Sequence, residues 1–254
     1  MKNSMRMLAK ELKEILRTYK IYVVPGIFLL FGFASPILTK LMPKLLANLA
    51  DEINLILPEM TWMDSYAQFF KNLVQIGILA IILTTMGTIA DERKRGVTQL
   101  ILTKPVSRTG YVVAKYSANL LLISAATLAA FFATWLYTDI LFDGTQFAVG
   151  LGATGLYLVY AAVILALTIA ASAVTKSTVA AGGLSILGYF ILSLLPLFGK
   201  GLSKYSPAVL VNHISQVIAG TADTANLCWI VVVAAATILG LLTLGSTLFN
   251  RQEL

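Results

Sequence analysis

The chain has 254 residues, of which 58% are hydrophobic and only 12% are charged. About a quarter of the residues in soluble domains are charged, so this composition excludes an ordinary soluble protein and indicates an integral membrane protein. The net charge of +7 does not indicate a nucleic-acid partner, because the basic residues are spaced along the edges of apolar stretches and form no basic face with interleaved aromatic residues.

Residues 1–20 have the pattern of an amphipathic helix. Apolar residues recur at three- and four-residue spacing, and basic residues lie between them. Such a helix suits the membrane interface, where its basic face meets anionic head groups. A secretory signal is the alternative, but its charged region would be unusually long and would contain acidic residues. The apolar positions are Met5, Leu8, Leu12, Ile15, Leu16 and Tyr19.

Six stretches free of Asp, Glu, Lys, Arg and His follow, and each reaches the roughly 18 residues that mark a membrane-spanning helix. Lipid offers the backbone no water to bind, so the spans should be helices. The predicted fold class is all-α, a bundle of six transmembrane helices that forms a single transmembrane domain over residues 1–254. The spans are predicted at about 21–40, 68–90, 115–138, 147–174, 177–199 and 225–249.

Lys and Arg gather on one side of these spans, which predicts the orientation. The head, the loop after the second span, Lys176 and Arg251 carry most of the basic residues, whereas acidic residues dominate the opposite side. We therefore expect a multi-pass protein of the plasma membrane with both termini in the cytoplasm.

Two further segments lie on the predicted outer side. Residues 43–58 repeat an amphipathic pattern between Pro43 and Pro58, which predicts a second interfacial helix, with a plain connector as the alternative. Residues 205–218 are crowded with polar groups and predict a short surface helix. That helix would contain His213, which we expect to be solvated or to cap a helix, since one imidazole without neighbouring ligands makes a poor metal site.

The sequence contains no pattern typical of a catalytic or energy-converting site. The six apolar stretches have no ionisable residues, whereas ion-driven transporters generally keep such groups inside the bilayer. There is no Ser, His and carboxylate set and no phosphate-binding glycine motif. We expect a non-enzymatic protein without a metal site, which depends on a partner for any energy.

Residues 91–110, DERKRGVTQLILTKPVSRTG, are the exception to this apolar pattern. Val97, Leu100 and Ile101 would share one face of a helix that begins with acidic and ends with basic residues. Pro105 would end that helix, and Ser107 is a plausible N-cap for the next one. A charged helix with an apolar ridge suggests a docking surface; the alternative is a solvated loop whose positive charges only determine topology.

The same stretch resembles the signature of ABC transporter permeases of the second exporter family. The residues that carry the resemblance are Glu92, Gly96, Leu100, Pro105, Val106, Ser107, Arg108 and Lys115. The plan of an amphipathic head, six spans and a short inner loop, AVTKST, is also similar. The chain departs from the family at GVTQL, where members often have a Thr-Leu-Glu run, so an acidic contact is in doubt.

The resemblance implies a permease subunit of an ATP-driven exporter with a cytoplasmic coupling helix. Its partners would be an ABC ATP-binding subunit dimer, a second permease that is either a copy of itself or a sister subunit, and membrane lipid. ATP and Mg would be bound by the partner, so no cofactor is expected on this chain. The predicted contact residues are Glu92, Arg93, Arg95, Gly96, Val97, Leu100, Ile101, Pro105, Ser107 and Arg108.

In that contact, Leu100 and Ile101 would fill an apolar cleft on the ATP-binding subunit, with Glu92, Arg93 and Arg95 as a polar rim. The predicted cargo is hydrophobic or amphipathic. Two alternatives remain open at this point. One is a membrane scaffold or immunity-type protein that binds a partner without transport, and the other is an integral membrane enzyme, which the missing catalytic cluster disfavours.

Overall fold

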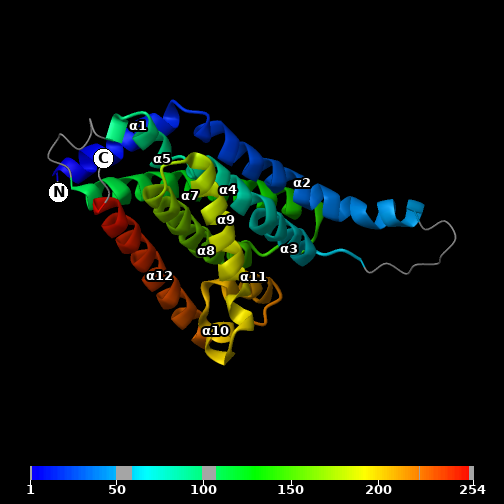
Figure 1. Ribbon diagram of the computed structural model, residues 1–254. Helices are drawn as coiled ribbons and strands as arrows, with labels where there is room; N and C mark the ends of the chain where they lie inside the picture. Colours follow the sequence, from blue (N-terminus) through cyan, green and yellow to red (C-terminus); the bar gives the residue numbers. More distant parts are fainter. Residues whose placement is uncertain (1, 50–58, 99–106, 223, 252–254) are drawn as a thin grey trace.

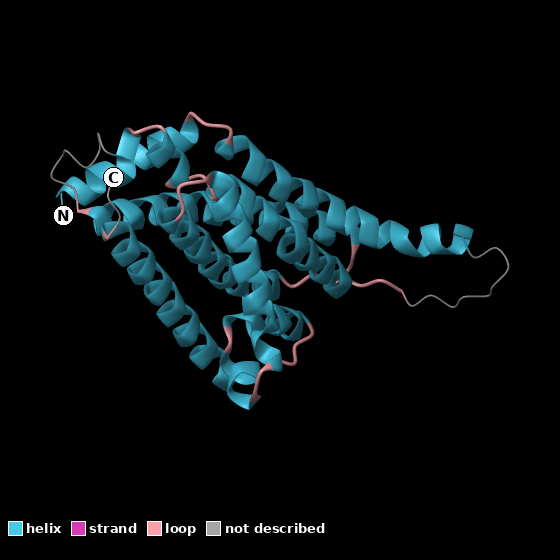
Figure 2. Cartoon of the chain, in the orientation of Figure 1, coloured by secondary structure: helices cyan, strands magenta, loops and turns pink. Residues whose placement is uncertain are grey.

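A computed structural model describes residues 2–49, 59–98, 107–222 and 224–251 of the protein (Figure 1). Every regular element within these ranges is a helix (Figure 2). The elements are α1 (Lys2–Leu16), α2 (Lys20–Leu49), α3 (Trp62–Asn72), η1 (Leu73–Gly77), α4 (Ile78–Thr85), α5 (Ala90–Lys94), α7 (Arg108–Leu141), α8 (Phe147–Val174), α9 (Thr178–Leu194), η2 (Leu195–Leu197), α10 (Lys200–Tyr205), η3 (Pro207–Val209), α11 (Leu210–Ile218) and α12 (Thr224–Asn250).

The prediction of an all-α bundle with six membrane-spanning helices is confirmed. Six helical runs in the described part of the chain are long and apolar enough to cross a bilayer. The second run extends from α3 through η1 and α4 to α5, with turns at residues 86–89. The runs are Lys20–Leu45, Trp62–Lys94, Arg108–Leu141, Phe147–Val174, Thr178–Leu197 and Asn226–Asn250.

Helix α8 forms the centre of the bundle. It packs against α4, α7, α9, α11 and α12, and most of its surface is buried. Its many alanines let the neighbouring helices approach closely, as small residues do between membrane helices. The rings of Tyr157 and Tyr160 are fully buried among these neighbours. In contrast, α9 and α12 leave most of their apolar surface exposed.

Helices α2 and α7 form the most extensive pair through a close backbone approach. A Cβ added at Gly32 would lie 2.7 Å from the carbonyl oxygen of Ala130, so only glycine fits at this position. Pro36, four residues later, has no N–H to bond the Gly32 carbonyl. The hydroxyl of Thr134 on α7 donates to that carbonyl instead, at 3.2 Å, in a bond that it shares with the Ala130 carbonyl of its own helix at 2.9 Å. The pair thus satisfies a backbone group that lipid would leave unpaired.

The outer segment at residues 43–58 differs from its prediction. Helix α2 continues through Pro25, Pro36 and Pro43 to Leu49, so Pro43 does not begin a separate helix. A proline interrupts only its own helical bond and adds a clash with the turn before it, and spanning helices tolerate this when their neighbours rebind the freed carbonyl. Residues 50–58 of the predicted helix lie outside the described residues.

The prediction of a surface helix at residues 205–218 is only partly correct. Helix α11 forms there, but one face is buried against α8 and α3. His213 belongs to that buried face, with 7% of its surface exposed, so the expectation of a solvated or capping histidine is wrong. The polar residues that suggested a fully exposed helix occupy the opposite face: Asn212, Ser215 and Gln216 are exposed.

Candidate functional site

The amphipathic head, the stretch at residues 91–98 and the start of α7 meet at the end of the bundle that carries both termini (Figure 1). A compact group of four charged side chains and one tyrosine joins them, which we call the charged junction: Lys10, Glu11, Glu92, Tyr111 and Lys115. Glu11 and Lys115 lie on the buried, mostly apolar faces of α1 and α7, whereas α5 is itself mostly charged. The junction is therefore a polar contact that joins the charged α5 to two apolar helix faces.

Lys115 is the centre of the junction. Only 1% of its side chain is exposed, and its Nζ lies 2.9 Å from Glu11 Oε2 and 2.8 Å from Glu92 Oε1. The hydroxyl of Tyr111, one turn earlier on α7, donates to the other oxygen of Glu92. One buried cation thus connects α1 to Glu92, near the start of the stretch at residues 91–98. A buried charge is stable only when it is paired in this way.

Lys10 closes the junction toward the solvent. Its Nζ lies 3.0 Å from Glu11 Oε1, 3.0 Å from Glu14 Oε2 and 3.5 Å from Glu92 Oε1. Partial burial by itself would lower the pKa of Lys10, but the three carboxylates together outweigh this effect and raise that pKa. Lys10 therefore stays protonated at neutral pH, and together with Lys115 it balances the negative charge of the carboxylates.

The carboxylates of Glu11, Glu14 and Glu92 come within 4.8 Å of one another, a spacing that would suit a metal ion. The ammonium groups of Lys10 and Lys115 already lie among these oxygens and bind them directly. The arrangement is therefore an ion-pair network in which two lysines bind the carboxylates. This network holds α1, α5 and α7 together.

Helix α5 is also connected to the adjacent ends of α8 and α9. The backbone N–H groups of Ile89 and Ala90 donate to the Ser172 hydroxyl at 3.0 and 3.1 Å, which satisfies donors that a helix start leaves unpaired. The Thr178 hydroxyl at the start of α9 donates to the Asp91 carboxylate. Helix α5 is thus bound both to the end of α8 and to the start of α9.

Arg108 extends these connections to the last helix. Its Nη1 donates to the carbonyl oxygens of Phe249 and Asn250, at 3.3 and 3.0 Å. These are C-terminal carbonyls of α12, where a cation complements the helix dipole. The rings of Tyr111 and Phe249 stack beside them, with centroids 5.9 Å apart. The start of α7 therefore holds the end of α12 against the junction.

The structure places several predicted contact residues. Ser107 is the N-cap of α7, as predicted, and its hydroxyl accepts from the N–H of Gly110 at 3.1 Å. Gly96 has a positive φ of 71°, so one continuous helix from residue 91 is excluded; α5 ends at Lys94, and Val97 and Thr98 are helical again. Predicted contact residues Leu100, Ile101 and Pro105 lie outside the described residues.

Of the predicted polar rim, Glu92 is mostly buried: its side chain is 12% exposed and points to Lys115 and Tyr111. Its contact with an ATP-binding subunit stays a prediction. Arg93 lies over the ring of Phe249, with 5.9 Å from its guanidinium carbon to the ring centroid. Arg95, in contrast, is exposed. The buried partner that attracts Glu92 inward is Lys115, whose burial is decided by tertiary packing.

Sequence reasoning missed Glu11 altogether. On α1 it lies between Met7 and Ile15 at four-residue spacing, on the face that packs against α7, and it is 4% exposed. A carboxylate on a buried face was the available signal, because such a group needs a cation nearby. Leu16 and Tyr19, which we assigned to the apolar face, are exposed instead.

Comparisons with known proteins agree with this arrangement. A family model described as "ABC-2 family transporter protein" matches residues 5–254. The chain is also similar to a Bacillus subtilis (strain 168) protein named "Uncharacterized transmembrane protein YxlG", with 26% identity over 225 residues that cover 86% of each chain. Because the family model covers nearly the whole sequence, the protein belongs to the ABC-2 family of transporter membrane proteins, whose members are generally the non-catalytic permease components of ABC transporters.

Proposed function

We propose that the chain is the permease subunit of an ATP-driven exporter that moves a hydrophobic or amphipathic substrate. A separate dimer of ATP-binding subunits supplies the energy, and a second permease, identical or related, completes the path. The protein lies in the plasma membrane with both termini in the cytoplasm. The observation that carries the proposal is the charged junction, which binds the segment at residues 91–98 to α1 and α7.

The junction explains how a push on this segment reaches the spans. Glu92 transmits displacement through Lys115 to α7, and Asp91 transmits it through Thr178 to α9. Arg108 holds the end of α12 to the start of α7. Charge-assisted hydrogen bonds are short and directional, so they move helices together better than apolar contacts that slide. A partner bound near residues 95–108 would therefore move several spans at once.

A membrane scaffold or immunity-type protein that binds a partner without transport is the alternative function. It would need the same docking surface but no connection from that surface to the spans. The links from α5 to α7 and α9 favour the permease.

The test is a pull-down of the ATP-binding partner together with its ATPase rate in reconstituted membranes. Leu100→Asp/Ile101→Asp should abolish both partner binding and stimulated hydrolysis, because central apolar anchors carry most interface energy, about 2 kcal/mol or more each. The matched control is Lys94→Ala, since Lys94 is exposed and exposed ion pairs contribute roughly 0 to 1 kcal/mol. Normal binding and stimulation in the double variant would refute the coupling role.

A further inference from the structure

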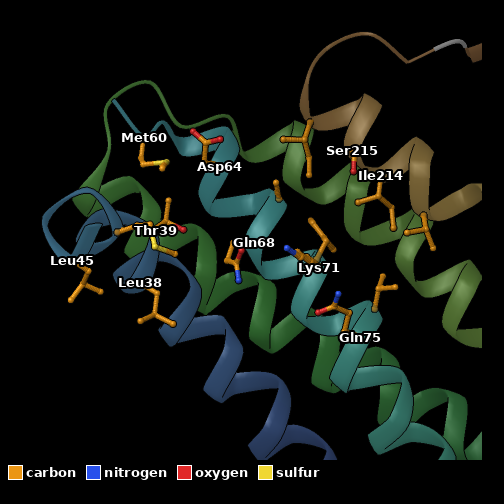
Figure 3. Close-up of a pocket in the computed structure, with 16 residues that line it drawn as sticks. Leu38, Thr39, Leu45, Met60, Asp64, Gln68, Lys71, Gln75, Ile214 and Ser215 are labelled. Atoms are coloured by element: carbon orange, nitrogen blue, oxygen red, sulfur yellow. The ribbon is translucent and has the colours of Figure 1, made fainter. Parts of the chain in front are cut away.

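A groove opens on the bundle at the end opposite the charged junction. Its volume is about 540 Å³, within the range of roughly 300 to 1,000 Å³ that small-molecule sites occupy. One face of α3 and η1 forms the floor, and α2 and α11 form the walls (Figure 3). By the proposed topology this end faces the outside of the cell.

The floor of the groove is polar. Asp64, Gln68, Lys71 and Gln75 follow one another at spacings of four, three and four residues, which places them on one helix face (Figure 3). Lys71 lies about 14 Å along the helix from the start of α3. A charged and amide-rich stripe is costly against lipid, so this face needs an aqueous or ligand environment.

The walls of the groove are apolar. Leu38 and Met42 of α2 lie on one side, and Val211, Ile214 and Ile218 of α11 lie on the other. Polar groups on the floor between two apolar walls match an amphiphile, whose head group needs hydrogen bonds and whose chain needs apolar contact.

The charges on the floor are not equally available. Asp64 accepts hydrogen bonds from the N–H and the hydroxyl of Thr61, at 2.8 and 2.9 Å, so its carboxylate is engaged at the start of α3. Lys71 is exposed in the groove and forms no ion pair within the described residues. Both side chains keep their charge, but Lys71 lies about 10 Å along the helix from Asp64, so the middle of the groove presents a cation whose complement is an anionic group.

The floor also contains a departure from regular helix geometry. Residues Leu73–Gly77 form a π-helical turn that begins two residues after Lys71, and such turns often occur at functional sites. The Leu73 carbonyl at this turn accepts a hydrogen bond from the buried Tyr157 hydroxyl at 3.3 Å. The central helix α8 thus supports the irregular turn that presents Gln75 to the groove.

We propose that this groove binds an anionic amphiphile, with a phosphate or carboxylate head group at Lys71 and its hydrocarbon chain against α2 and α11. That the amphiphile is cargo rests on the proposed function, whereas its binding needs no ATP-binding partner. Gln68 and Gln75 flank Lys71 and donate amide hydrogen bonds to the head group.

Native mass spectrometry of the full chain in an uncharged detergent tests the site. The probes are palmitoyl lysophosphatidylglycerol, palmitate and palmitoyl lysophosphatidylcholine. We expect the two anionic probes to bind at least about tenfold more tightly than the zwitterionic one, the difference expected for one charge-assisted contact. The tighter of the two anionic probes identifies the head group as phosphate or carboxylate.

The variants separate the site from general effects. Lys71→Gln should abolish the preference for anionic probes and Lys71→Arg should retain it, while Lys44→Gln, on the exposed surface of α2 outside the groove, should leave binding unchanged. Equal binding of all three probes, or an unchanged preference in Lys71→Gln, would overturn the proposal. So would a loss of dimers in Lys71→Gln without a change in probe binding, because the face would then be an interface between copies.

This assay contains no ATP-binding protein. A negative result here would therefore leave the coupling test undecided and refute only the groove, and a failed coupling test would not remove the binding site.

Discussion

Replacing Lys115 by Met is the sharpest test of the charged junction. Methionine keeps the length and apolar packing of the lysine stem but removes the ammonium group that binds Glu11 and Glu92. Both carboxylates stay buried, with side chains 5% and 12% exposed. Breaking a buried ion pair in this way typically costs about 3 to 5 kcal/mol, because it leaves an uncompensated charge.

The structure places the expected loss near the lower limit of that range. Lys10 remains 3.0 Å from Glu11 and 3.5 Å from Glu92, and the Tyr111 hydroxyl still donates to Glu92. We therefore expect a loss of about 3 kcal/mol, which corresponds to a melting temperature lower by roughly 6 to 12 °C for a chain of this size.

Thermal unfolding of the purified protein in detergent measures this loss. Glu11→Gln alone should also destabilise the protein, and the double variant Lys115→Met/Glu11→Gln should lose less than the sum, with a coupling energy of about 0.5 to 3 kcal/mol. Lys94→Met is the control, because Lys94 is exposed and should shift the melting temperature little. Equal melting temperatures for the Lys115 and Lys94 variants, or additive losses, would refute the reasoning.

Three further predictions concern topology, the head and helix packing. Single cysteines at Asn54 and Gln99, in a background without the native cysteine, should be labelled from opposite sides of intact cells; labelling from one side would contradict the six-span topology. Removal of residues 2–18 should leave membrane insertion intact but weaken assembly, measured by membrane fractionation and size-exclusion chromatography, because the apolar spans carry the insertion energy; a protein that fails to insert would identify a targeting signal. Gly32→Leu should sharply lower yield and melting temperature, since its Cβ would meet the α7 backbone at 2.7 Å. Gly26→Ala is the control and should lower neither, because no atom lies within 4 Å of the added Cβ. Similar behaviour of the two variants would refute the packing argument.

The elements that depend on local rules could be predicted from the sequence. Uncharged stretches of sufficient length become spanning helices because a helix is the only open-chain structure that satisfies its backbone in lipid. The N-cap at Ser107 also follows from local chemistry, since its hydroxyl reaches the N–H of Gly110 only three residues away. The continuation of α2 through Pro43 was missed, because local rules treat proline as a boundary and neighbouring helices can compensate for it.

The charged junction and the groove depend instead on which helix faces meet. Glu11 and Lys115 are separated by 104 positions in the chain, and neither local segment indicates that the two side chains meet. Only the packing of α1 on α7 buries both side chains. Once both are buried, removing either one leaves the other charge uncompensated, which destabilises the fold. His213 is buried for the same reason, because α11 turns that face toward α8. The sequence by itself thus determined how many helices cross the membrane, whereas the tertiary structure decided which polar side chains they hold in contact, since the energy of a buried charge depends on its neighbours in space.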